Sequence, residues 1–255
     1  MTYNGYLNVA TDAIMESGKI LLKYFRKNNK IVFKEDNSPV TIADTESEKN
    51  IIKILTNKFP NHSILGEESG SHDNDSEYLW VIDPLDGTSN FSNEIPYFCI
   101  SIGLLHHKKP VVAAIYDPTH EDLFTATKDG GAYLNGKKLD INDFKNNKTS
   151  YISLVYTRSS QKKDVINKIF SNLNPPKYRM RNMGAAALEL AYVASGKTQG
   201  IIINGNNPWD VCAGILLIQE AGGLVSDFNN QEWTFNSESI IAAPKKVHEN
   251  LRLVL

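Results

Sequence analysis

The segment Trp80–Phe91, WVIDPLDGTSNF, decides how this chain is interpreted. Its apolar beginning predicts a buried strand that ends at Asp83, and the small polar residues from Gly87 onward predict the start of a short helix. Two carboxylates, Asp83 and Asp86, are then expected at a strand end, facing the N-terminus of that helix. Carboxylate oxygens bind hard cations, and free backbone N–H groups at a helix N-terminus bind anions. The segment therefore predicts a site for phosphate-ester chemistry.

The composition is that of an ordinary globular chain. The 255 residues are 41% hydrophobic and 22% charged, and 27 basic against 29 acidic side chains give a net charge of −2. This balance lacks the strongly basic footprint of a nucleic-acid binder, so direct binding of nucleic acid is not expected. No apolar run reaches the roughly 18–20 residues of a membrane span, and no signal peptide is recognised. Cys99 and Cys212 lie far apart in apolar runs, which indicates reduced thiols and a cytoplasmic protein.

The pattern of expected elements changes near the middle of the chain. Amphipathic helices and then antiparallel hairpins are expected in the first part, whereas strands alternate with helices in the second. We interpret 1–145 as an N-terminal α+β half that carries the metal-binding motifs. Residues 146–255 form a C-terminal α/β half that completes the site, within a single compact catalytic domain. The polar segment Lys145–Thr149 is the expected seam, and Gly70–Glu77 is expected to be a surface loop.

Four acids stand beside glycine or proline at the ends of expected strands or helices, namely Glu67, Asp83, Asp86 and Asp210. Each alone is typical of a helix cap or a turn. Two carboxylates buried close together, as in the DPLDG segment, are unfavourable unless a cation joins them. An all-carboxylate set suits a hard cation, and Mg²⁺ is the common intracellular one. No histidine cluster has zinc spacing, and the pair His106-His107 is expected to be plain surface in a hairpin turn.

Three motifs carry a resemblance to a known family. They are Gly66–Ser69 (GEES), Asp83–Phe91 (DPLDGTSNF) and Pro208–Gly214 (PWDVCAG). Together they resemble the signatures of the inositol monophosphatase family, as found in bacterial members. That family belongs to the Mg²⁺-dependent, lithium-sensitive phosphatase superfamily, which also contains fructose-1,6-bisphosphatase and the 3′-phosphonucleotide phosphatases. The resemblance implies an α/β fold with αβαβα layers, and a homodimer.

The resemblance also implies roles for individual residues. Two to three Mg²⁺ ions per subunit would be held by Glu67, Asp83, the carbonyl group of Leu85, Asp86 and Asp210. The substrate and its phosphate group would contact Asp86, Gly87, Thr88, Ala186 and Asp210. Catalysis would depend on Glu67 and on the pair Asp44 and Thr88, which orients the attacking water. The implied reaction is hydrolysis of a small phosphate monoester by metal-activated water.

One position departs from the inositol-specific pattern. In inositol-specific members an acid usually lies seven residues before the aspartate that matches Asp210, and it contacts ring hydroxyls; here that position is Ile203. Asn204, Asn206 and Asn207 are either substitute polar contacts or solvated loop residues. The substrate therefore stays open between inositol-1-phosphate and a related sugar or polyol phosphate. A 3′(2′),5′-bisphosphate nucleotide, fructose-1,6-bisphosphate, histidinol phosphate and NADP are the alternatives.

A function of another class also stays open. Some bacterial relatives resemble this chain closely in Met183–Gly200 and act as antitermination partners in transcription. The near-neutral charge opposes direct RNA binding but not binding to a protein of a transcription complex. A third alternative, a pseudo-enzyme that binds metal and phosphate without turnover, is disfavoured because Asp44 and Thr88 are both present.

Overall fold

The computed structural model describes residues 2–27, 32–33, 39–142, 150–156, 163–173 and 178–255. The helices are α1 (Tyr3–Tyr24), α2 (Ile42–Lys58), α3 (Thr88–Ser92), α4 (Lys163–Asn172), α5 (Ala186–Ala194), α6 (Pro208–Glu220) and α7 (Lys245–Arg252). The strands up to residue 138 are β1 (Val32–Phe33), β2 (Pro39–Val40), β3 (Ser63–Gly66), β4 (Gly70–His72), β5 (Tyr78–Asp86), β6 (Cys99–His106), β7 (Lys109–Asp117), β8 (Asp122–Thr127), β9 (Gly131–Leu134) and β10 (Lys137–Lys138). The later strands are β11 (Ser150–Tyr156), β12 (Tyr178–Arg181), β13 (Gly200–Asn204), β14 (Leu224–Ser226) and β15 (Ser239–Ala243).

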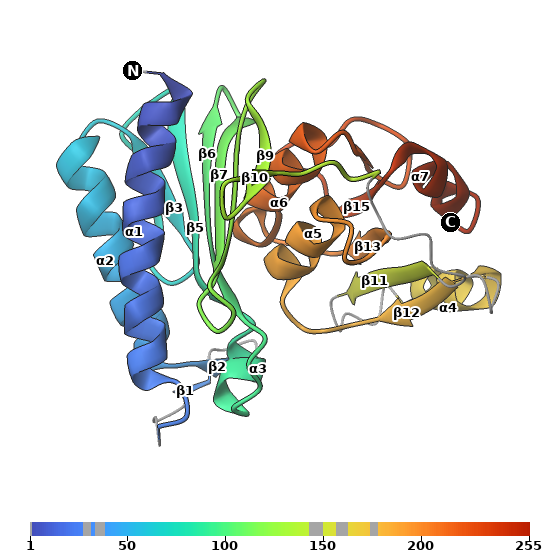
Figure 1. Cartoon of the computed structure of the whole chain (residues 1–255), viewed down its shortest axis with the longest axis horizontal. Coiled ribbons are helices and arrows are strands. Elements are labelled where there is room, and N and C mark those ends of the chain that lie inside the picture. Colours follow the sequence, from blue (N-terminus) through green and yellow to red (C-terminus); the bar gives the residue numbers. More distant parts are fainter. Residues whose placement is uncertain (1, 28–31, 34–38, 143–149, 157–162, 174–177) are drawn as a thin grey trace.

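Two large sheets organise the chain. The first has eight strands in the order β10-β9-β8-β7-β6-β5-β3-β4, and its pairs are antiparallel except β3 with β5. The second has five strands in the order β12-β11-β13-β15-β14, in which β11 is parallel to both of its neighbours. The short strands β1 and β2 pair with each other beside α3 (Figure 1).

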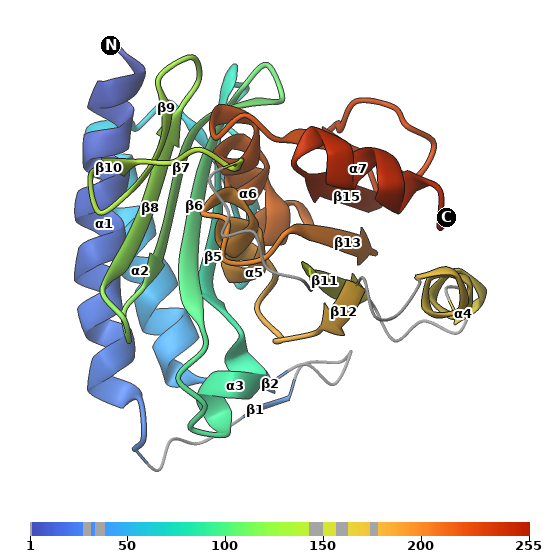
Figure 2. The ribbon, with the colours of Figure 1, turned by 45° about the vertical axis from the view of Figure 1, so that its right-hand side comes forward.

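Helices and sheets alternate in five layers. Helices α1 and α2 cover one face of the first sheet, and α5 and α6 fill the space between the two sheets, as two views agree (Figures 1 and 2). Helices α4 and α7 cover the outer side of the second sheet. The predicted αβαβα arrangement is therefore confirmed.

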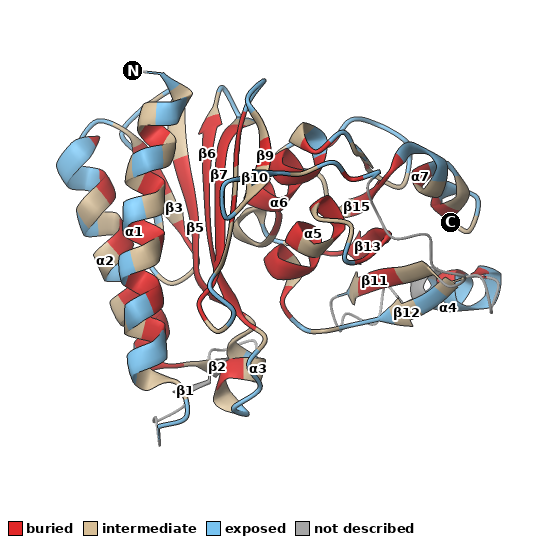
Figure 3. Ribbon diagram, in the orientation of Figure 1, coloured by how far each residue is buried: buried red, intermediate tan, exposed pale blue. Residues whose placement is uncertain are grey.

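Apolar side chains explain this layering, because each sheet face and each helix stripe must be covered. Figure 3 shows that buried residues are concentrated on the strands of the first sheet and on α5 and α6 beside it. One buried cluster joins α1 and α2 to the first sheet and includes Ile14, Leu55 and Trp80. The cluster between the sheets contains most of the side chains of α5 and α6. These two helices read as continuous apolar runs because they are covered on both sides. A third, smaller cluster packs Ile169 of α4 and Leu251 of α7 against the second sheet.

Strand β5 carries the decisive segment and differs from its expected limits. It continues through Pro84 to Asp86 instead of ending at Asp83, and its pairing with β6 shifts register between these two aspartates. Asp83 pairs with Ser101 and Asp86 with Cys99, so β5 has one extra residue there. Proline has no N–H group to donate, which a bulge tolerates. The extra residue also brings two aspartates three positions apart to the same side of the strand.

Two other expectations change. The segment expected as a loop from Gly70 begins with β4, which pairs with β3 through backbone groups and so leaves no apolar pattern in the sequence. The expected seam Lys145–Thr149, and with it the boundary between 1–145 and 146–255, lies outside the described residues. The division into two halves remains a prediction. None of the described helices combines the length and the apolar composition that crossing a bilayer requires.

Candidate active site

The bulge of β5 places two carboxylates in the interior. Asp83 is only 2% exposed and Asp86 only 9% exposed. Burial raises the pKa of Asp83 well above its ordinary value, and the charges of Glu67, Asp86 and Asp210 raise it further. The four acids singled out in the sequence therefore lie near enough to repel one another through the protein interior. Such a group is stable with all its charges only if a cation neutralises them.

Asp86 is fixed by the beginning of α5, which belongs to the later part of the chain. Its Oδ1 accepts the N–H of Ala186 at 3.1 Å, and its Oδ2 accepts the N–H groups of Ala187 at 2.7 Å and Leu188 at 3.4 Å. The thiol of Cys99 lies 3.6 Å from Oδ2. Burial raises the pKa of Asp86 to about 7 although these hydrogen bonds lower it. The helix thus holds a carboxylate at its N-terminus, where the backbone N–H groups have no other partners.

Asp210 lies in the first turn of α6, where Pro208 starts the helix. Its Oδ2 accepts the backbone N–H of Asn207 at 2.9 Å and the side-chain amide of Asn207 at 3.3 Å. Burial raises the pKa of Asp210 to about 7, and the charges of Asp86 and Glu67 contribute to the increase. This aspartate is therefore both the helix cap that its sequence position suggests and a member of the carboxylate group.

Glu67 follows β3 directly, and its backbone N–H donates to the carbonyl of Ile82 at 3.1 Å. The preceding Gly66 allows a close approach, because a Cβ there would lie 2.2 Å from Oε1 of Glu48. Oε1 of Glu48 accepts the N–H of Glu68 at 3.0 Å. A buried glutamate of α2 thus fixes the turn that presents Glu67 to the other acids, a role that the sequence analysis missed.

Asp44 and Thr88 meet as expected. The Thr88 hydroxyl lies 3.3 Å from Oδ1 of Asp44 and 3.0 Å from the carbonyl oxygen of Leu85, so its single proton is shared between two acceptors. The other oxygen of Asp44 accepts the N–H of Thr41 at 2.8 Å and its hydroxyl at 2.6 Å, as part of a capping box at the start of α2. Burial raises the pKa of Asp44 to about 6, and the charge of Glu67 adds to this effect.

Gly87 connects β5 to α3 in a conformation that favours glycine. Its φ of 92° lies in the left-handed region, and it is the N-terminal cap of α3. The sharp turn brings Thr88 back toward the carbonyl of Leu85, only three residues earlier. The predicted strand, turn and short helix are therefore present, with the strand three residues longer than expected.

The four carboxylates lie near one another, but their oxygen atoms do not converge on one cation position. In the described parts of the chain, no three of them have all their oxygen atoms within 4.8 Å of one another. Asp86 and Asp210 point their oxygens at backbone N–H groups instead. The donor set of four carboxylates and the Leu85 carbonyl fits a hard cation such as Mg²⁺ and offers nothing to a soft one. Burial and the charges of neighbouring acids raise the pKa values of Asp83 and Asp210, which is the physical sign that positive charge suits this place.

Two positions named from the sequence, Ala186 and Ile203, have contacts within the protein. Ala186 donates its N–H to Asp86, so its expected contact with substrate remains a prediction. Ile203 is fully buried in the cluster between the sheets, and its side chain is part of the core. It therefore cannot hydrogen-bond a substrate, and no acid replaces it at that strand position.

Two further supporting residues escaped the sequence analysis. Asn90 donates its side-chain amide to the carbonyl groups of Tyr97 and Met183, each at 2.8 Å, and so joins the segment after β5 to the segment before α5. Oε1 of the buried Glu189 accepts the N–H groups of Met183 and Gly184, both at 3.1 Å. Only the polarity of Glu189 within the apolar run of α5 could have indicated this role.

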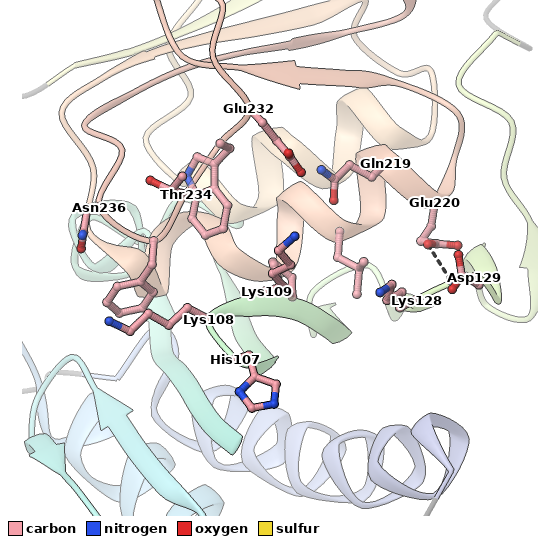
Figure 4. A pocket seen from close by; sticks show the side chains of 14 residues that line it. His107, Lys108, Lys109, Lys128, Asp129, Gln219, Glu220, Glu232, Thr234 and Asn236 are labelled. Atoms are coloured by element: carbon pink, nitrogen blue, oxygen red, sulfur yellow. Dashed lines mark hydrogen bonds between the residues drawn. The ribbon is translucent and has the colours of Figure 1, made fainter. Parts of the chain in front are cut away.

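A cavity of about 550 Å³ lies away from the carboxylates. It is bounded by the β6–β7 turn, the end of α6 and the segment 232–236, and Figure 4 shows Lys109, Gln219 and Glu232 pointing into it. His106, at this end of β6, pairs with Tyr78 at the start of β5, whereas the carboxylates lie at the other end of β5. Cavity volume alone therefore does not identify the candidate active site.

Comparisons with known proteins agree with this site. The sequence profile of the inositol monophosphatase family matches residues 3–254. An inositol monophosphatase of Dictyostelium discoideum is 37% identical over 262 residues, which cover 100% of this chain and 96% of the relative. A protein of Pasteurella multocida named Nus factor SuhB is 35% identical over 260 residues, which cover 98% of this chain and 96% of that protein.

The fold has close counterparts among solved structures. The inositol monophosphatase from Anabaena (Nostoc) sp. PCC 7120 superimposes with a TM-score of 0.85 at 35% identity, over 98% of this chain and 95% of that one. The likeness thus extends over the whole chain in sequence and in structure. The chain belongs to the inositol monophosphatase family, a family of phosphoric monoester hydrolases.

Proposed function

We propose that this protein is a Mg²⁺-dependent phosphomonoesterase that acts on a small phosphorylated molecule. The observation that carries the proposal is the convergence of Glu67, Asp83, Asp86 and Asp210, in which burial and the charges of neighbouring acids raise the pKa values of Asp83 and Asp210. We assign them, with the Leu85 carbonyl, as ligands of two to three Mg²⁺ ions. Bound Mg²⁺ would supply positive charge for the phosphate group and an activated water.

The remaining residues position the reactants. Asp44 holds the Thr88 hydroxyl, and through it the orientation of the attacking water, because its other oxygen is fixed by Thr41. The backbone N–H groups of Gly87 and Thr88 lie at the turn into α3 and are assigned to the phosphate oxygens. Ala186 is assigned to the substrate through its N–H group, once Asp86 turns from α5 toward a cation.

The substrate class follows from what surrounds this centre. The buried Ile203 offers no carboxylate to ring hydroxyls, so recognition of myo-inositol by that acid is absent. We propose a small sugar or polyol phosphate, inositol-1-phosphate included, as the substrate. Nucleotide bisphosphates, fructose-1,6-bisphosphate, histidinol phosphate and NADP are competing substrates to be compared in the same assay.

The test is a phosphate-release screen with Mg²⁺ over these phosphomonoesters. We expect turnover of at least one sugar or polyol phosphate, its loss on chelation of Mg²⁺, and inhibition by lithium, a family property. Activity that is indifferent to both chelation and lithium would contradict the proposal. The Asp44→Asn variant is the control, because it keeps the proposed metal ligands and alters only the residue that orients water.

A second role is supported by one specific observation. A relative named Nus factor SuhB covers nearly the whole chain at 35% identity. We propose a partner in a transcription complex as an added or alternative function, through contact with protein, since the net charge of −2 does not favour RNA. Pull-down with transcription proteins, compared between the wild type and an Asp83→Asn variant, separates binding from phosphatase activity. Absence of any captured transcription protein would remove this alternative.

Assembly and location complete the proposal. We propose a homodimer in the cytoplasm. The two cysteines, Cys99 and Cys212, are free and buried, which fits a reducing compartment. Light scattering coupled to size exclusion tests the dimer, and a mass near 28.5 kDa would contradict it.

A further inference from the structure

A second group of metal-binding side chains lies at the end of β5 that is remote from the carboxylates. It consists of Glu77, which precedes β5, and of His106 and His107, at the end of β6. Nε2 of His106 is 3.7 Å from Oε2 of Glu77, and Nε2 of His107 is 3.6 Å from Oε1 of the same side chain. One ligand atom from each of the three residues lies within 4.8 Å of the others. The two histidines lie at a hairpin turn as expected, but they share Glu77 as a partner and are therefore more than plain surface.

The backbone explains how two neighbouring histidines point to one carboxylate. Adjacent residues of a regular strand point to opposite faces. Here His107 and Lys108 form a two-residue turn between β6 and β7, with φ of 50° and 62° in the left-handed region. Glycine or asparagine usually occupies such positions, because other side chains are strained there. The turn brings the rings of His106 and His107 to a centroid distance of 4.3 Å.

Other contacts hold the three residues in place. The N–H of His107 donates to the carbonyl of Glu77 at 2.9 Å, so the backbones of two ligands are joined directly. The His106 ring stacks on Tyr78, with 4.4 Å between centroids and 8° between planes. Only 27% of the His106 side chain is exposed, against 62% for His107 and 66% for Glu77. One ligand is therefore fixed, while two can adjust by small rotations.

We propose that Glu77, His106 and His107 form a binding site for a borderline divalent transition-metal ion, of which Zn²⁺ is the representative. Two imidazole nitrogens and one carboxylate are a common ligand set for Zn²⁺, whereas Mg²⁺ prefers oxygen ligands. Ligands around tetrahedral Zn²⁺ lie roughly 3.3 Å apart. Each histidine is within 3.7 Å of one Glu77 oxygen, and one ligand atom from each of the three residues lies within 4.8 Å of the others, so small side-chain rotations close the site. Water would complete the exposed coordination sphere.

The ammonium group of Lys109 does not block this site. In Figure 4 the His107 ring points away from the ammonium group of Lys109, which extends toward Gln219 and Glu232 in the cavity beside α6. The site is also separate from the proposed catalytic centre, because His106 pairs with Tyr78 at the start of β5 and not with the bulged end. A bound ion would join the β6–β7 turn to the residue before β5.

The test uses the full chain, prepared without a histidine tag and with Mg²⁺ in excess to occupy the carboxylates. Zn²⁺ is titrated in competition with a chromophoric chelator, for the wild type and for variants His106→Ala, His107→Ala and Glu77→Gln. We expect each histidine variant to weaken Zn²⁺ binding at least about tenfold, since even residues that only support a ligand change metal affinity on that scale. His72→Ala is the matched control, because His72 is an exposed histidine outside the group and should leave the affinity unchanged.

Cu²⁺ provides a second readout that does not depend on catalytic activity. We expect its electron paramagnetic resonance spectrum to show coupling to two imidazole nitrogens in the wild type and to one in either histidine variant. Phosphate release with Mg²⁺ should be unchanged in all variants, which verifies that they are folded. A spectrum with oxygen ligands alone, or equal Zn²⁺ affinity for the wild type and the His106→Ala variant, would overturn the proposal.

Discussion

The two ends of β5 carry charged groups in opposite circumstances. At its bulged end, Asp83 and Asp86 are buried and face other acids, and burial raises their pKa values. At its beginning, Glu77 is 66% exposed and faces two imidazole rings. The first end gathers oxygen ligands around two buried aspartates, whereas the second mixes nitrogen and oxygen ligands in contact with solvent. One strand thus offers two kinds of cation site. Repulsion between the ligands is strong at the buried end and weak at the exposed end, because solvent screens the charges there.

The strongest way to break this comparison is the substitution Asp83→Asn. We expect kcat to fall by at least ~10³, the scale of losing a principal electrostatic element of catalysis. The stability of the metal-free protein should not fall, because the substitution removes a buried, repelled charge. Phosphate-release kinetics and thermal unfolding with and without Mg²⁺ measure both effects. The increase of Tm by Mg²⁺ should be strongly reduced in the variant, and near-normal turnover would contradict the metal assignment.

The second prediction concerns Thr88, which follows the bulged end. Thr88→Val keeps the shape of the side chain but removes the hydroxyl between Asp44 and Leu85. We expect kcat to fall by ~10²–10⁴, the usual contribution of a positioned proton-transfer group, with a small change in KM. Thr88→Ser restores the hydroxyl and should recover most of the activity. Equal kcat values for the valine and serine variants would show that the hydroxyl acts only as a helix cap.

The third prediction concerns how the stability of the metal-free protein depends on pH, because burial raises the pKa values at the bulged end. The pKa values of Asp86 and Asp210 are about 7 in the folded chain, far above the ordinary value of 3.8. Between these values the folded state binds more protons than the unfolded state, so the free energy of unfolding of the metal-free protein decreases as pH rises toward and through 7. Mg²⁺ binds the ionised carboxylates, and its effect on Tm should grow over the same range.

Thermal unfolding in a chelator and in Mg²⁺, from about pH 5 to about pH 8, measures this linkage. The Asp86→Asn variant should show a weaker dependence on pH in the chelator, since one of the responsible groups is gone. A metal-free protein whose Tm rises steadily across this range would contradict the assigned direction.

The smallest effect is expected at the exposed end of the strand. Glu77→Gln should leave kcat unchanged and alter the free energy of unfolding by no more than about 0.5 kcal/mol in the absence of transition metals, because exposed ion pairs contribute little. Chemical denaturation with Mg²⁺ present measures it. A loss of activity in this variant would show that the two ends of β5 are coupled.

Much of the fold could be predicted from sequence, because it depends on patterns that one segment contains. The apolar periodicity of α1, the Thr41 side chain that caps α2 and the proline at the start of α6 are local signals, each contained in the segment that forms its element. Strand β4 was not predicted, because it is held by backbone pairing in a polar segment. The extension of β5 to Asp86 was not predicted either, because the bulge depends on the register of β6.

The same distinction applies to the candidate site. The motifs around Glu67, Asp83 and Asp210 indicate metal-binding carboxylates from local sequence alone, and the structure brings these acids near one another. Glu48 and Glu189 were missed because their partners are backbone N–H groups in other segments, which no spacing reveals. His106 and His107 were dismissed because their partner, Glu77, becomes a neighbour only through strand pairing.

The grip of α5 on Asp86 has a further consequence. The aspartate belongs to one sheet, whereas the three amides that hold it belong to a helix that packs against both sheets. An ion that draws this carboxylate toward itself must loosen the helix, and by reciprocity a helix that holds it firmly must weaken the ion's hold. Cation binding at the carboxylates and the hydrogen bonds of α5 to Asp86 are therefore thermodynamically linked. Mutations in α5 that do not contact the ion can still change its affinity.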